Sequence, residues 1–123
     1  MGISADQFWQ SSANGKAMVN MLARRGDVEI VRDVCDWLVG MYGKDLIAGA
    51  VQQGATMEQA RVASQNNTAG LQSSVDSIND RNVLAVSMGI VDAVFQRHYN
   101  AGKPAYDKVM AQFAAELRQR VTD

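Results

Sequence analysis

The sequence predicts an all-α fold, a compact bundle of five to seven helices in a single domain over residues 1–123, around a central apolar helix at about 81–99. Three observations predict it. Residues 83–95 are apolar almost all the way round, yet they are too short to span a bilayer, so they suit the centre of a bundle. Apolar residues after Pro104 recur at steps of three and four, as on one helix face. No segment shows the alternation of a strand.

The N-terminal part of the chain carries local helix signals. A first helix is expected to begin at Ser4, because Gln7 follows three residues later as in a capping box. The Asn14–Gly15 pair is expected to break or kink it. Gly26 then ends the helical stretch, and Asp27 is expected to cap the helix that follows.

The next helix is predicted over residues 28–42, where apolar side chains mark one face and charged side chains the other. Gly43 is expected to end it. A short helix follows at about residues 46–51, and Gly54 is expected to stop that one.

Thr56 and Gln59 form a second capping box, which predicts a helix start. The segment after it, 57–80, has a thin apolar stripe and a polar middle of poor helix formers at 66–70. It is therefore expected to be either one helix or two helices joined by a loop near 66–70.

The C-terminal helices are bounded by glycine and proline. Gly102 suits the end of the central helix, because glycine accepts a backbone conformation that other residues avoid. Pro104 suits the first turn of the last helix, where no amide donor is needed. That helix is predicted to run from about 104 to 121.

Composition excludes several classes of protein. A net charge of −1 argues against a strongly basic nucleic-acid or membrane-surface protein. One cysteine, Cys35, cannot form an internal disulfide, and the first residues show no basic or apolar leader, so we expect a cytoplasmic protein. With one histidine and one cysteine, no metal site and no cofactor are predicted. Cys35 lies on an apolar face and is interpreted as an inert core residue.

Three residues of the central helix are the candidates for ligand binding: Asp92, His98 and Tyr99. Asp92 interrupts the apolar run within a strip of small and polar residues. This strip either reaches solvent, lets a neighbouring helix approach closely, or leaves room for a ligand. His98 lies in the last turn, where a cation is favoured by the partial negative charge of the helix end. Tyr99 adds an aromatic wall. These residues define the second hypothesis, a small-ligand-binding protein or an enzyme with a pocket near Asp92.

The leading hypothesis is a small interaction or adaptor module, of bacterial or phage-like character and without recognisable catalytic residues. The polar segment 57–80 is its predicted partner-binding surface, with Gln65, Asn66 and Gln72 as candidate residues. We expect a homodimer, since closed two-fold dimers are the commonest oligomers. A third hypothesis is nucleic-acid binding. It rests on a faint helix-turn-helix pattern in residues 57–78, which lacks the basic residues that phosphate contacts need.

Overall fold

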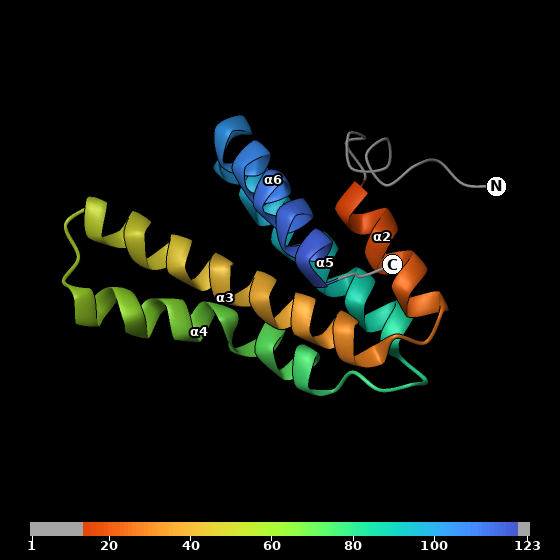
Figure 1. Cartoon of the computed structure of the whole chain (residues 1–123). Coiled ribbons are helices and arrows are strands. Elements are labelled where there is room, and N and C mark those ends of the chain that lie inside the picture. Colours follow the sequence, from red (N-terminus) through yellow and green to blue (C-terminus); the bar gives the residue numbers. More distant parts are fainter. Residues whose placement is uncertain (1–13, 121–123) are drawn as a thin grey trace.

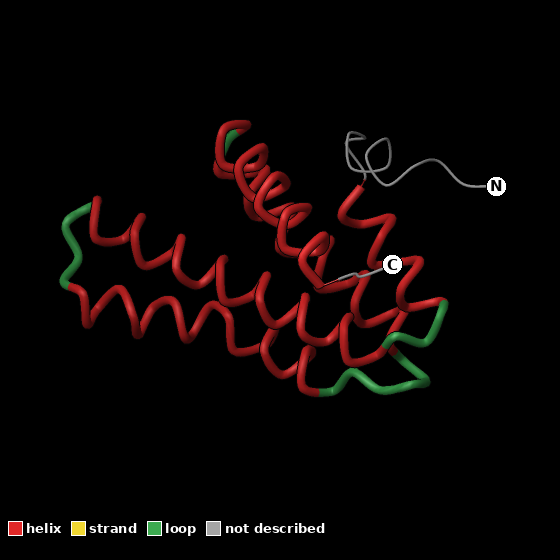
Figure 2. The backbone as a smooth tube through the Cα atoms, in the orientation of Figure 1, coloured by secondary structure: helices red, strands yellow, loops and turns green. Residues whose placement is uncertain are grey.

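The computed structural model describes residues 14–120, and over that range the chain forms five helices and no strand. They are α2 (Asn14–Arg24), α3 (Val28–Gln52), α4 (Met57–Asp76), α5 (Val83–Ala101) and α6 (Lys103–Arg120), joined by short loops (Figure 2). The predicted all-α fold is confirmed. The helix expected to begin at Ser4 lies outside the described residues.

Two helical hairpins make up most of the fold (Figure 1). Helices α3 and α4 pack along each other, α5 packs against α6, and α2 lies against α5. The loop joining α3 to α4 lies at a free end that projects away from the other helices in Figure 1. The α3–α4 hairpin is therefore anchored at one end and open at the other.

The core is shared between α3 and α5, each of which contacts every other described helix. The buried residues of α3 come from its first half and end at Val39, whereas those of α5 are spread from Val83 to His98. One side of α5 faces solvent, because Ala85, Gly89 and Asp92 are all exposed. The prediction of one central helix surrounded by the others is not confirmed.

Glycine ends α2 and α3 in the same way, as the sequence predicts. Gly26 has φ +81° and follows α2, and the amide of the next residue, Asp27, bonds back to the Leu22 carbonyl. Gly54 has φ +101° and closes α3 with the same pattern of bonds. This arrangement satisfies carbonyl groups at the helix end and needs a residue that tolerates positive φ. Asp27 stands at the start of α3, but its side chain makes no capping hydrogen bond.

The predicted helix end at Gly43 is wrong. Helix α3 continues through this residue to Gln52, so the separate helix at 46–51 does not exist. Glycine inside a helix costs only about 1 kcal/mol, which packing can offset. Here α4 lies close to α3, and the Ser64 hydroxyl donates to the Gly43 carbonyl at 2.8 Å.

The alternative of a loop near 66–70 is also wrong, because α4 is a single helix. Polar side chains that favour turns instead bond back to carbonyls one turn earlier. Asn67 donates to Ala63 and Thr68 donates to Ser64. The turn that a helix-turn-helix motif needs is therefore missing between residues 57 and 76.

Three other boundaries agree with the sequence. The capping box at Thr56 and Gln59 is formed in both directions, with distances of 3.1 Å and 3.0 Å. Gly102, with φ +124°, follows α5, and Pro104 lies in the first turn of α6.

Candidate functional site

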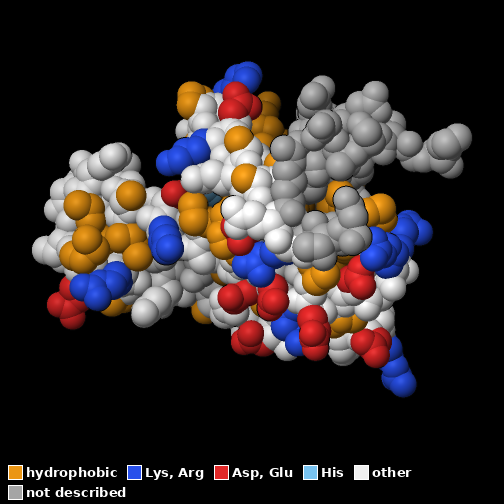
Figure 3. Space-filling model, in the orientation of Figure 1, with side chains coloured by type: hydrophobic (Ala, Val, Ile, Leu, Met, Phe, Trp, Pro, Cys, Tyr) orange, Lys and Arg blue, Asp and Glu red, His pale blue; other side chains and the backbone are white. Residues whose placement is uncertain are grey.

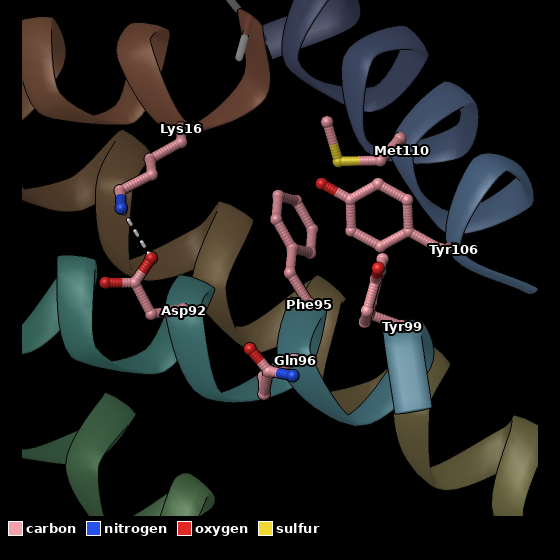
Figure 4. A pocket seen from close by; sticks show the side chains of 7 residues that line it. All are labelled: Lys16, Asp92, Phe95, Gln96, Tyr99, Tyr106 and Met110. Carbon is pink, nitrogen blue, oxygen red and sulfur yellow. Dashed lines mark ion pairs between the residues drawn. The ribbon is translucent and has the colours of Figure 1, made fainter. Parts of the chain in front are cut away.

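A groove that α2, α5 and α6 line brings together two of the predicted ligand residues, Asp92 and Tyr99 (Figure 4). These residues are seven positions apart in α5, which places them on one helix face. The groove has a volume of about 610 Å³, within the range of small-molecule sites. It is lined by Lys16, Asp92, Phe95, Gln96, Tyr99, Tyr106 and Met110. We call it the aromatic groove.

The aromatic side chains of this groove continue into the core. Tyr99, which is 62% exposed, meets Tyr106 edge-on at a ring-centroid distance of 5.5 Å. Tyr106 meets Phe95 at 6.2 Å, and Phe95 meets the buried Phe113 at 5.3 Å. Edge-on contacts of this kind are favourable for aromatic rings. The exposed tyrosine is thus held by a chain of rings anchored in the interior.

Asp92 stands at the other end of the groove, where its carboxylate contacts the Lys16 ammonium at 2.7 Å (Figure 4). Both side chains are about half exposed. An ion pair so open to water contributes little to stability, on the order of 0–1 kcal/mol. The strip that contains Asp92 therefore reaches solvent, which is one of the predicted alternatives. The carboxylate remains accessible to a ligand.

The third predicted ligand residue, His98, faces a different part of the molecule. It is only 5% exposed, and its Nε2 lies 3.0 Å from the Asp45 carboxylate of α3. Its Nδ1 lies 2.9 Å from the Val94 carbonyl oxygen. The sequence predicted a role for His98 at the helix end but did not identify its partner, because Asp45 is 53 residues away in the sequence.

The two ring nitrogens of His98 face different parts of the fold. Nδ1 meets a carbonyl of its own helix, and because a carbonyl can only accept a hydrogen bond, Nδ1 is the donor in that contact. Nε2 meets the Asp45 carboxylate on the neighbouring helix. His98 and Asp45 therefore form a side-chain link between α5 and α3.

This pair forms part of the wall of a second hollow, which has a volume of about 500 Å³. We call it the basic cleft, because Arg97 of α5 and Lys108 of α6 both line it. The other lining residues are Tyr42, Asp45, Leu46, Ala48, Gly49, Gln52, His98, Ala101 and Ala105. Its residues come from the second half of α3, the end of α5 and the start of α6. Lys103, near it in sequence, instead pairs with Asp107 of its own helix.

The predicted partner residues on α4 divide into two groups. Gln65 and Asn66 are exposed. The Gln72 amide is already bonded, at 3.0 Å to Asp36 and 3.3 Å to Asp76.

Large apolar side chains lie in the open at the start of α4. Met57 is 52% exposed and Val62 is 51% exposed. Val62, Ala63 and Asn66 line a shallow hollow of about 530 Å³. We call Val62, Ala63 and Asn66 the α4 patch; Met57 lies at the first residue of the same helix. Hydrophobic side chains gather at this end of the hairpin on the face shown in Figure 3.

Cys35 is fully buried in the core, and burial raises the pKa of its thiol to about 12. The thiolate, which is the reactive form, is therefore suppressed. This agrees with the interpretation of Cys35 as an inert core residue. Among the described side chains, no three histidine, cysteine or carboxylate groups gather as metal ligands do.

Comparison with protein-family models, with curated proteins and with solved structures finds no match for this chain. Within residues 14–120, no helix combines the length and the apolar character needed to cross a membrane. The aromatic groove, the basic cleft and the α4 patch are three surfaces that the described part of the chain offers to a partner or ligand.

Proposed function

We propose that this protein is a self-associating interaction module, and that the α4 patch of one copy binds the same patch of a second copy. One observation carries the proposal: two large apolar side chains, Met57 and Val62, lie half exposed at the free end of the α3–α4 hairpin. Val62 also lines a shallow hollow together with Ala63 and Asn66.

Burial of these side chains supplies the driving force. Complete burial of a valine or methionine side chain is worth roughly 1.5–3 kcal/mol. About half of that gain is still unrealised for Met57 and Val62, because each is half exposed. The small side chain of Ala63 lets a second helix approach closely, and the Asn66 and Gln65 amides can bond at the edge of the contact.

The charge of this end favours a second copy as the occupant. Residues 44–61 hold two basic and two acidic side chains: Lys44, Arg61, Asp45 and Glu58. Two copies therefore meet without net repulsion. Two α3–α4 hairpins packed together have the composition of a four-helix bundle, built by a two-fold axis. The patch is small, so we expect a weak dimer, with a Kd on the order of micromolar.

Sedimentation velocity over a range of protein concentrations tests this proposal. Val62→Asp places a charge at the centre of the α4 patch and is expected to weaken the dimer at least tenfold. Ala115→Asp is the matched control, because it adds the same charge at an exposed position of α6 and should leave the dimer unchanged. A monomeric wild-type chain at ~100 µM, well above the expected Kd, or an equally dimeric Val62→Asp variant, would overturn the proposal.

The candidate residues Gln65, Asn66 and Gln72 are expected to behave differently. Asn66→Ala and Gln65→Ala should weaken the dimer slightly, since they lie in or beside the patch. Gln72→Ala should act on folding stability instead, because the Gln72 amide joins α4 to Asp36 of α3. We further propose a cytoplasmic location, which is supported by a lone free thiol, Cys35, that has no partner for an internal disulfide.

A second candidate function is small-ligand binding in the aromatic groove. The exposure of Tyr99 beside the accessible Asp92 carboxylate favours it. Native mass spectrometry of protein purified from a bacterial host tests it. A reproducible added mass that disappears in Tyr99→Ala supports a ligand there, and a bare chain mass in the wild-type protein counts against it.

A further inference from the structure

We propose that the basic cleft binds a small organic anion, a carboxylate or phosphate group carried on a compact apolar body. This site goes beyond the self-association proposed above and uses other residues. Its cations, Arg97 and Lys108, come from α5 and α6, while most of its apolar wall comes from α3.

Within the described residues, the positive charges of Arg97 and Lys108 are not neutralised by a neighbouring acidic side chain. Neither makes an ion pair with any residue between 14 and 120. The Arg97 guanidinium carbon lies 5.5 Å from the centre of the Tyr42 ring, a contact that orients the guanidinium without neutralising it. A planar guanidinium with free N–H groups matches a carboxylate or a phosphate, which it can bind through two parallel hydrogen bonds. The lysine offers a second, more flexible cation.

The acidic residue of the cleft, Asp45, does not cancel this charge. Its carboxylate is already engaged by the His98 ring, whose Nε2 lies 3.0 Å away. Tyr42 packs edge-on against His98 at 5.4 Å and helps to fix the ring. The cleft thus has two cationic side chains, Arg97 and Lys108, against a single carboxylate, and its net charge is positive.

The remaining walls suit an apolar body. Leu46 is the one large aliphatic side chain, and the small residues Ala48, Gly49, Ala101 and Ala105 keep the cleft open. Its volume of about 500 Å³ lies within the range of ligand sites. A one-ring or two-ring acid would place its ring against Leu46 and its anionic group near Arg97.

Benzoate and phenyl phosphate are suitable probes, titrated into the 15N-labelled full chain at constant ionic strength and followed by amide chemical shifts. We expect saturable shifts centred on residues around the cleft, such as Gly49 and Ala101. Arg97→Gln and Lys108→Gln should each weaken the binding about tenfold. Arg81→Gln is the matched control, because it removes the same charge from an exposed position outside the cleft.

The two probes identify the source of the anionic group. Tighter binding of benzoate assigns a carboxylate, and tighter binding of phenyl phosphate assigns a phosphate. Shifts that sodium chloride reproduces, or equal losses in Arg97→Gln and Arg81→Gln, would overturn the proposal. The dimer is expected to persist in Arg97→Gln. A failure of the anion-binding proposal can therefore be distinguished from a failure of the self-association proposal.

Discussion

Ser64 of α4 donates a hydrogen bond to the backbone carbonyl of Gly43, in the middle of α3, at 2.8 Å. A methyl group placed on Gly43 would lie 3.2 Å from the Ser64 Oγ atom, closer than ordinary van der Waals contact. The glycine therefore allows the two helices to approach each other. Gly40, one turn earlier in the same helix, has no atom within 4 Å of such a methyl group.

These two glycines give a matched pair of variants. Gly40→Ala should raise the free energy of unfolding by roughly 0.5–1 kcal/mol, because alanine is the better helix former and nothing obstructs it. Gly43→Ala should gain nothing or lose stability, since its methyl group displaces Ser64. Urea denaturation of both variants measures the difference. Equal gains in both would show that close approach at Gly43 is unimportant.

The contact between the His98 ring and the Asp45 carboxylate predicts coupled losses of stability. His98→Gln and Asp45→Asn should each lower the free energy of unfolding by about 1–3 kcal/mol, because each leaves a partly buried polar partner unsatisfied. The double variant should lose less than the sum of the two. A double-mutant cycle at neutral pH measures the coupling. Losses that add within ~0.5 kcal/mol would mean that the two side chains act independently.

The buried thiol predicts a dependence of stability on pH. The pKa of Cys35 rises from 9.0 to about 12 on folding, so the folded chain keeps the proton that the unfolded chain releases. The contribution of this thiol is therefore complete below pH 9 and declines between pH 9 and 12, by about 1.4 kcal/mol per pH unit.

Cys35→Ala isolates this contribution from other alkaline titrations. Between pH 8 and pH 10, its free energy of unfolding should fall less steeply than that of the wild-type protein. Parallel slopes for the two proteins would contradict the assignment. As a second measurement, iodoacetamide should modify the folded wild-type protein slowly at pH 8, and rapidly only after urea is added.

Removal of the exposed ion pair between Lys16 and Asp92 is expected to have a small effect on folding stability. Asp92→Asn should change the free energy of unfolding by less than about 1 kcal/mol, because water screens the pair. Thermal or urea denaturation at low and high salt measures this. A loss well above that value would mean that the Asp92 carboxylate is needed for folding stability. It would then not be free to bind a ligand in the aromatic groove.

Local signals in the sequence predicted the helix boundaries that depend on near neighbours. The capping box at Thr56 and the glycine at Gly54 act within a few residues, so both were predictable. Gly43 resembles Gly54 in sequence, yet one lies inside a helix and the other ends it. The packing of Gly43 against Ser64, which is 21 residues away, arises only in the folded chain and leaves no local signal in the sequence.

The candidate site shows the same division. Asp92 and Tyr99 could be paired from the sequence because both belong to one face of one helix. His98 could not be assigned its role, because Asp45 lies on another helix and exposed acidic residues are common. The pairing of Arg97 with Lys108 in one cleft likewise depends on how α5 and α6 meet α3.

Cys35, the only cysteine in the chain, is enclosed in the core, which makes the native protein a convenient background for site-directed labelling. A cysteine introduced at an exposed position such as Ser73 would be the one readily reactive thiol, with no need to remove the natural one. In the proposed dimer, a spin label attached there would report one distance between the two copies. Labels at several exposed positions, measured one at a time, would together test how the two copies are oriented.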